Sequence, residues 1–282
     1  MAIGLFGLHR GGSAEPAALA QRARQAEAAG FESLWVGDHI ALPAGAAAPH
    51  GMPAEEARLE AVVGLTYLAA LTQRVKVGVG VIVLPQRQPV LLAKQLATLD
   101  VLSGGRLIVG IGVGYLEPEL RALGASLADR GARTDEYLAA MRALWDEPVP
   151  SFHGRFVAFD DVMQRPRPVQ RPHPPIVMGG QSAAAYRRTI ASANGWYGFD
   201  LDLERTATAL ADLRAAAQQV ARPPELGELE ITITPTEEMT PDLARRYGEL
   251  GVHRLAIQPA SMDGPTMDAL IARLAETVLP KL

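Results

Sequence analysis

The sequence predicts a single-domain α/β fold, a (β/α)8 barrel spanning residues 1–282. Three observations favour it. A length of 282 residues suits one such barrel. Short apolar segments alternate with segments of helical periodicity, which is typical of parallel strands joined by helices. The third predicted strand is almost continuously apolar, as expected for a parallel sheet covered on both faces. Two doubly wound domains are the alternative, but no linker divides the chain.

Strands and helices alternate along the sequence. The strands are expected at residues 2–7, 31–37, 75–84, 106–113, 176–179, 195–198, 229–234 and 252–258. The first helix is expected after a cap at Ser13 and ends at Gly30. The other helices are expected at residues 55–71, 89–103, 135–145, from 182 onward, 203–220, 241–250 and 267–278. A hairpin and a proline-rich segment at about 150–174 form an insertion before the fifth strand.

Composition excludes several classes of function. The chain has no cysteine, which excludes disulfides, thiolate zinc sites and a cysteine nucleophile. A net charge of −4 gives no basic field for nucleic acid. No apolar run reaches the roughly 18 residues of a membrane helix, and the first residues lack the basic start of a signal peptide. We therefore expect a cytoplasmic protein with no membrane or nucleic-acid partner. The six histidines lack metal-ligand spacing, so no metal is expected.

Chemistry in such a barrel is expected just after the strands, at their C-terminal ends. The second strand ends with Asp38 and His39, a pair that could orient a ligand or exchange a proton. Alternatively, Asp38 accepts hydrogen bonds from loop amides while His39 packs. The third strand holds Gly78 and Gly80, which indicate either close approach of a ligand or room for a bulky neighbour.

Two further strand ends are rich in glycine. The fourth ends in GIGVG followed by Tyr115, which is not a dinucleotide fingerprint because no helix starts at its last glycine. The fifth ends in Gly179, Gly180, Gln181 and Ser182, and a helix follows. Free N–H groups at a helix start can bind a phosphate, although a simply capped turn has the same sequence pattern.

Several longer strings occur together and in order. They are FESLWVGDHI, VGVGVIVLPQRQPVLLAKQLATLDVLSGGRLIVGIGVGY, GARTDEYLAAMRALW, FHGRFVAFDDV and RPVQRPHPPIVMGGQS. With these motifs, over about residues 1–200, the chain resembles the luciferase-like monooxygenase family, and most closely its branch that uses the deazaflavin coenzyme F420. The resemblance implies a flavin-type ring lying across the strand ends, a small-molecule substrate and a homodimer.

The resemblance also implies roles for particular residues. It implies a cis peptide bond between Gly80 and Val81, behind the cofactor ring. It places His39 on the substrate side. Because the cofactor chemistry also requires a group that supplies or takes a proton, we expect His39 in that role, with Tyr115 and His9 as lesser candidates. The remaining residues expected at the cofactor are Asp38 beside the ring, Gly114, Gly179, the phosphate-binding amides of Gly180, Gln181 and Ser182, and Trp196 as a pocket wall.

Two departures from the family pattern bear on cofactor and substrate. Val113 stands where many flavin-using relatives have an arginine that helps to hold the phosphate, which favours F420 over FMN. Tyr115 stands where a sugar-phosphate dehydrogenase of the deazaflavin branch has an acidic glutamate, so that substrate is not carried over. The expected activity is hydride transfer between F420 and a small, mostly apolar organic molecule.

Two alternatives differ in class. One is an FMN-dependent monooxygenase that receives reduced FMN from a separate reductase. The other is a non-catalytic protein that only binds the cofactor, because a barrel keeps its fold after losing its chemistry.

Overall fold

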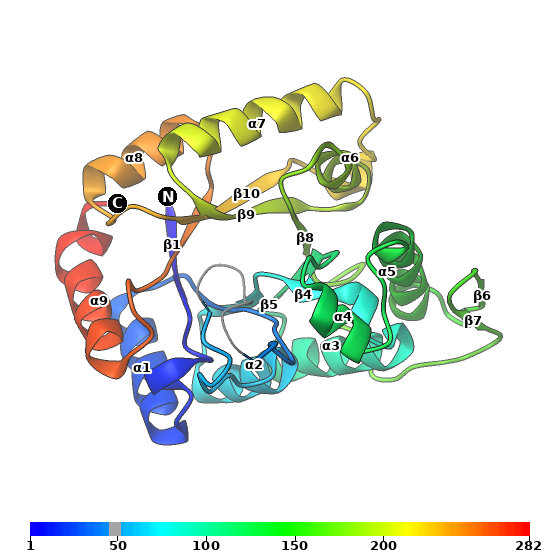
Figure 1. Ribbon diagram of the computed structural model, residues 1–282, viewed down its shortest axis with the longest axis horizontal. Helices are drawn as coiled ribbons and strands as arrows, with labels where there is room; N and C mark the ends of the chain where they lie inside the picture. The colour runs from blue at the N-terminus through cyan, green and yellow to red at the C-terminus, as the bar shows by residue number, and fades with distance from the viewer. Residues whose placement is uncertain (45–51) are drawn as a thin grey trace.

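The computed structural model describes residues 1–44 and 52–282, and it contains a closed parallel barrel surrounded by helices (Figure 1). The strands of the barrel are β1 (Ala2–Phe6), β2 (Ser33–Val36), β3 (Lys76–Val79), β4 (Ile82–Val83), β5 (Leu107–Gly112), β8 (Ile176–Gly179), β9 (Gly195–Leu201), β10 (Glu230–Pro235) and β11 (Arg254–Ile257). Their order is β3-β2-β1-β11-β10-β9-β8-β5-β4, and a further β3–β5 pairing closes the ring. Since β3 and β4 are two parts of one predicted strand, the predicted (β/α)8 barrel is confirmed.

The helices cover the outside of this barrel. They are α1 (Pro16–Ala29), α2 (Ala61–Leu71), α3 (Pro89–Ser103), α4 (Glu117–Ala122), α5 (Arg130–Asp146), α6 (Ala183–Ser192), α7 (Leu203–Ala217), α8 (Pro241–Glu249) and α9 (Gly264–Thr277). The insertion forms a two-stranded hairpin, β6 (Phe152–His153) and β7 (Ala158–Phe159), which projects beyond α5 (Figure 1). Within the described residues, no helix has the length and apolar character needed to cross a membrane.

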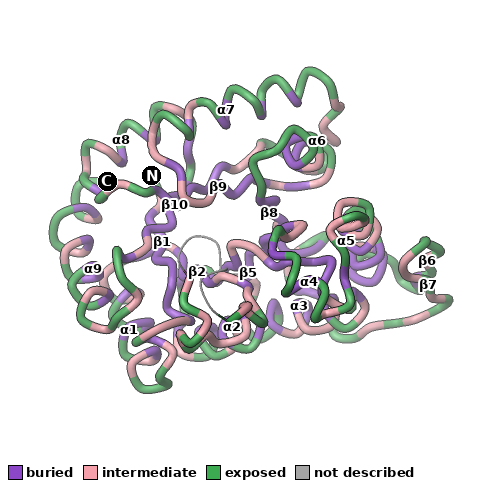
Figure 2. The backbone as a smooth tube through the Cα atoms, in the orientation of Figure 1, coloured by how far each residue is buried: buried purple, intermediate pink, exposed green. Residues whose placement is uncertain are grey.

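The strands lie inside the ring of helices, and the burial of the side chains reflects this. The barrel strands are almost entirely buried, whereas the helices expose their outer faces (Figure 2). The strands of the barrel supply Leu5, Leu34, Val77, Ile111 and Ile233 to the core, each 0% exposed. The side chains that can meet a ligand are therefore those that follow the strand ends.

Three predicted helix starts were wrong. α5 begins at Arg130 instead of residue 135. Glu15, not Ser13, caps α1 by accepting a hydrogen bond from the Ala18 amide at 2.9 Å. Ser13 is buried in a 3-10 turn, where its Oγ accepts from Arg22 Nη1 at 3.1 Å. The second helix begins at Ala61 instead of residue 55, because the preceding segment forms a loop bonded to the loop after β1. The Leu59 amide donates to the His9 carbonyl at 2.8 Å.

Gly80 and Val81 form the junction between β3 and β4. The Gly80–Val81 peptide bond is cis, as the resemblance implied. Val81 packs against glycine backbone on two neighbouring strands, since a Cβ at Gly112 would lie 2.5 Å from Val81 Cγ2 and one at Gly179 would lie 3.0 Å from Val81 Cγ1. On the other side, a Cβ at Gly80 would lie 2.4 Å from Cζ of Tyr197. The glycines therefore make room for bulky neighbours, and Gly80 and Val81 stay partly exposed.

We expect Gly80→Ala to destabilise the protein, because the added carbon would overlap the Tyr197 ring, whose hydroxyl lies 2.7 Å from Thr234 Oγ1. Overpacking of this kind typically costs about 1–3 kcal/mol, which corresponds to a fall of several degrees in Tm. Thermal unfolding followed by circular dichroism measures the effect. The matched control is Gly64→Ala in α2, where the nearest contact would be an ordinary 3.5 Å and alanine favours the helix. Equal Tm values for Gly80→Ala and the wild type would contradict this packing.

Candidate active site

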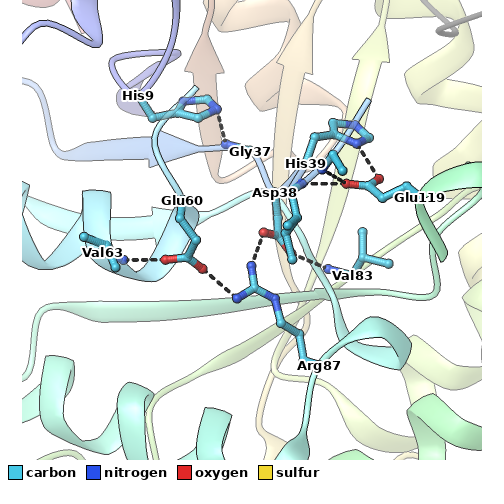
Figure 3. Close-up of polar contacts among 11 residues, drawn as sticks. His9, Gly37, Asp38, His39, Glu60, Val63, Val83, Arg87 and Glu119 are labelled. Atoms are coloured by element: carbon cyan, nitrogen blue, oxygen red, sulfur yellow. Dashed lines mark hydrogen bonds and ion pairs between the residues drawn. The ribbon is translucent and has the colours of Figure 1, made fainter. Parts of the chain in front are cut away.

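Asp38 joins three elements at the mouth of the barrel. It is 4% exposed, and its Oδ2 accepts a hydrogen bond from the Val83 amide at 3.0 Å. Its Oδ1 forms an ion pair with Nη2 of Arg87. Nη1 of the same guanidinium forms a second ion pair with Oε1 of Glu60 at 2.6 Å (Figure 3). Burial raises the pKa of the Asp38 carboxyl, and the Arg87 guanidinium acts in the opposite direction. Both carboxylate oxygens are thus engaged within the protein, as in the loop-amide alternative. The predicted contact of Asp38 with a cofactor stays a prediction.

Glu60 extends this network to the start of α2. Its carboxylate accepts a hydrogen bond from the Val63 amide at 2.8 Å and so caps the helix. The chain Val83–Asp38–Arg87–Glu60 therefore fixes the end of β4, the end of β2 and the start of α2 relative to one another (Figure 3). Sequence reasoning missed Arg87 and Glu60, although Arg87 closely follows a predicted strand end.

His39 and Tyr115, both predicted from the sequence, lie together. The distance from His39 Nε2 to the Tyr115 hydroxyl oxygen is 3.3 Å. The two rings pack edge to face, with 5.9 Å between their centroids. His39 exposes 17% of its side chain, while Tyr115 is 50% exposed. Burial and the charge of Glu119 raise the pKa of Tyr115, which keeps the phenol protonated near neutral pH. The pair can therefore exchange a proton with a molecule in the barrel mouth.

Glu119 is a third member of this cluster that sequence reasoning missed. Its side chain is 2% exposed, and its Oε2 lies 2.9 Å from His39 Nδ1 (Figure 3). Its Oε1 accepts hydrogen bonds from the amides of Ile40 and Ala41, the latter at 3.1 Å. Burial raises the pKa of Glu119, but His39 and the two amides outweigh this, so that the pKa is lowered. The buried carboxyl is therefore ionised. The sequence offered one signal for Glu119, namely its position in the segment that follows the fourth predicted strand, which the structure folds as the short helix α4.

His9 is a buried side chain that contacts the residue directly after β2. Its Nε2 accepts a hydrogen bond from the Gly37 amide at 3.1 Å, and the residue is 3% exposed. Burial, together with the charges of Arg10, Arg58 and His39, lowers the pKa of His9 to about 3. His9 is thus a neutral acceptor that supports the strand end. Its proposed part in proton exchange stays a prediction that this geometry does not favour.

The turn between β8 and α6 is open to solvent. Gly180, Gln181 and Ser182 are exposed, and Gly180 has a φ of +111°. Ser182 Oγ caps α6 by accepting from the Ala185 amide at 3.2 Å. The other amides of the first helical turn have no acceptor within the helix, and they carry the positive end of the helix dipole.

Trp196 supports this turn from beneath. It is 0% exposed, and its indole N–H donates to the Gly180 carbonyl at 2.9 Å. The expectation that Trp196 walls the pocket is corrected, because its ring is enclosed in the core. On the neighbouring strand end, Gly114 has a φ of +76°, and a Cβ there would lie 2.6 Å from Val83 Cγ1. Gly114 therefore allows close packing of the turn after β5.

These residues fit a cofactor that combines a flat ring with a phosphate. Gly80 and Val81 are partly exposed at the strand ends, and the β8–α6 turn offers backbone N–H groups to an anion. Residues 1–44 and 52–282 contain no group of three or more histidine or acidic side chains that could hold a metal.

Comparisons with known proteins agree with the fold. The family model described as luciferase-like monooxygenase matches residues 1–252. An uncharacterized protein of Mycobacterium tuberculosis is 32% identical over 267 residues, which cover 91% of this chain and 92% of that protein. The FMNH2-dependent dimethylsulfone monooxygenase of Pseudomonas putida is 39% identical over 133 residues, which cover 46% of this chain and 36% of that enzyme.

Among solved structures, an F420-dependent secondary alcohol dehydrogenase in complex with an F420–acetone adduct superposes with a TM-score of 0.81. Its sequence is 16% identical, and the match covers 100% of this chain and 99% of that one. At this level of identity the likeness shows the shared barrel.

The buried His9 predicts a pH dependence of stability. The unfolded chain takes up a proton on His9 near pH 6.5, whereas the folded chain does so only at about pH 3. The unfolded state therefore binds more protons between these values, and the free energy of unfolding falls as the pH drops from 6.5 toward 3. The expected loss between pH 7 and pH 5 is about 2 kcal/mol.

His9→Gln keeps an acceptor for the Gly37 amide and removes the titrating ring. We expect denaturant unfolding at both pH values to show a smaller loss in this variant. His153→Gln is the control, because that side chain is 69% exposed. An unchanged pH slope in His9→Gln would sink this assignment.

Proposed function

We propose that this chain, which belongs to the luciferase-like monooxygenase family, is an F420-dependent oxidoreductase that transfers a hydride between the deazaflavin and a small organic substrate. One observation carries the proposal. His39 lies at the barrel mouth between a buried carboxylate and a half-exposed phenol, which is an arrangement for proton exchange beside the strand ends.

The chemistry needs such a group. When bound, F420 supplies a carbon centre that accepts or donates a hydride. Loss of a hydride from a carbinol carbon leaves a carbonyl only if the hydroxyl proton also departs. Nε2 of His39 can take that proton, and in the reverse direction it returns the proton to the oxygen. Tyr115, hydrogen-bonded at the same nitrogen, links His39 to solvent.

Other residues of the mouth would hold the cofactor. The amides of Gly180, Gln181 and Ser182 and the first turn of α6 would bind its phosphate. Val81 would form the floor under the ring, because it is the partly exposed apolar residue at the β3–β4 junction. Val113 offers no cation to the phosphate, which supports the deazaflavin over FMN.

The second candidate is an FMN-dependent monooxygenase. Its support is the 39% identity to the Pseudomonas putida dimethylsulfone monooxygenase over 133 residues. That enzyme is FMNH2-dependent, so a chain of this kind would need reduced flavin from a separate reductase. The homodimer and the reductase stay predictions.

Titration of the purified protein with F420 and with FMN tests the cofactor. We expect F420 to bind more tightly, as measured by fluorescence. Gly180→Ala should weaken binding at least about tenfold, equivalent to about 1.4 kcal/mol. The added Cβ would lie 2.9 Å from that of Ala185, and the positive φ disfavours alanine. Gly227→Ala is the control, because it also has a positive φ but lies in open space. Tighter binding of FMN would replace the proposal by the second candidate, and binding of neither cofactor would contradict both.

His39→Ala tests the proton-exchange role. We expect turnover with F420 to fall by about 10²–10⁴-fold at each pH tested between about 5 and 8. Steady-state rates on a panel of alcohols and carbonyl compounds measure this. His153→Ala, which removes an exposed histidine, should keep wild-type rates. Full turnover of His39→Ala across this pH range would remove His39 from the mechanism.

A further inference from the structure

We infer that Glu119 is a positioning residue that holds His39 in the tautomer with hydrogen on Nδ1, so that Nε2 is the nitrogen that exchanges the proton. The inference deepens the proposed function, because it assigns the atom of His39 that meets the substrate. It is nevertheless a statement about the protein alone, and it can be tested without a cofactor.

The hydrogen bonds fix the direction of donation. An ionised carboxylate only accepts hydrogen bonds. Since Oε2 of Glu119 lies 2.9 Å from His39 Nδ1, that nitrogen must be the donor. Oε1 of Glu119 accepts hydrogen bonds from the backbone N–H groups of Ile40 and Ala41, and these two bonds prevent rotation of the carboxylate. Nε2 of the neutral ring then carries the lone pair, on the side of the half-exposed Tyr115.

Several charged or titratable groups surround the cluster of His39, Tyr115 and Glu119. Glu119 comes from α4, Tyr115 follows β5, His9 follows β1, and Arg58 lies in the loop before α2. The Arg58 charge acts on both Tyr115 and Glu119. Glu119 is the anion that is hydrogen-bonded to the imidazole, and this hydrogen bond orients the ring.

Glutamine at position 119 is a sharp test of this arrangement. A side-chain amide offers one acceptor oxygen and one donor NH2 group. The fixed amides of Ile40 and Ala41 both require the oxygen, which leaves the NH2 group facing His39 Nδ1. Nδ1 must then accept, and the proton of the neutral ring moves to Nε2. Glu119→Gln is thus expected to invert the tautomer while keeping both backbone hydrogen bonds.

The experiment is nitrogen NMR of the cofactor-free protein labelled with ¹⁵N-histidine, recorded from pH 5 to 9. The His39 resonances are assigned by their absence in His39→Ala. We expect Nδ1–H in the wild type and Nε2–H in Glu119→Gln. Tyr115→Phe is the matched control, because it removes the group at Nε2 and should keep the Nδ1–H tautomer.

Two results would overturn the inference: an Nε2–H tautomer in the wild type, or a Glu119→Gln variant with an unchanged tautomer. If Glu119→Gln does not fold, the wild-type tautomer alone decides. Steady-state kinetics add an independent readout. Because the Glu119 side chain is buried and does not face the substrate, kcat should fall with KM near the wild-type value. Correct tautomers without F420 turnover would reject the proposed function and leave the role of Glu119 intact.

Discussion

A buried carboxylate, Asp38, determines the geometry of the barrel mouth. A charge in the interior is tolerated only while partners hold it, and removal of one partner of such a pair typically costs about 3–5 kcal/mol. Here the partners are Arg87, which follows β4, and the Val83 amide within β4. The ion pair therefore keeps the ends of β2 and β4 at one separation. His39 is the next residue after Asp38, so its position depends on the same constraint.

The second constraint is steric and lies beside the first. The strand of the barrel that divides into β3 and β4 turns Val81 toward β5 and β8, where glycines 112 and 179 leave space for its side chain. Gly80 is pressed against Tyr197 on the opposite side. Any larger residue at these glycines would push Val81 or Tyr197 out of place. The partly exposed surface at Gly80 and Val81 is thus a product of close packing, and it lies near Val83, which the Asp38 network holds.

Local patterns predicted the barrel and the strand ends, because apolar periodicity and turn residues act over a few positions. They also placed Asp38 and His39 at the mouth. They did not show that His39 pairs with Glu119, 80 residues away, or that Asp38 pairs with Arg87, 49 residues away. Such pairings arise only when the closed sheet brings distant strand ends together. Many charged residues follow strand ends in the sequence, and no local pattern indicates which of them meet.

The wrong details have similar causes. Ser13 and Glu15 both stand where a helix cap is expected. Glu15 is the cap, because the Ser13 hydroxyl instead accepts a hydrogen bond from Arg22 of the following helix. Trp196 was expected in the pocket because the family resemblance implied it, but its indole N–H donates to the Gly180 carbonyl inside the core. In both cases a tertiary hydrogen bond decided the role of the side chain. Sequence spacing could not have supplied that bond.

Three consecutive residues at the end of β2 are held from three directions. Gly37 donates to His9, Asp38 binds Arg87, and His39 binds Glu119. The His39 ring is consequently placed by the protein before any cofactor or substrate arrives. A group that is already oriented needs no rearrangement when the reaction begins, which is how a rigid site lowers a barrier. This preorganisation serves hydride transfer, because the hydroxyl proton must pass to an acceptor at a fixed place when the hydride leaves the carbon. The choice of F420 over FMN rests in addition on the phosphate site, where Val113 offers no cation.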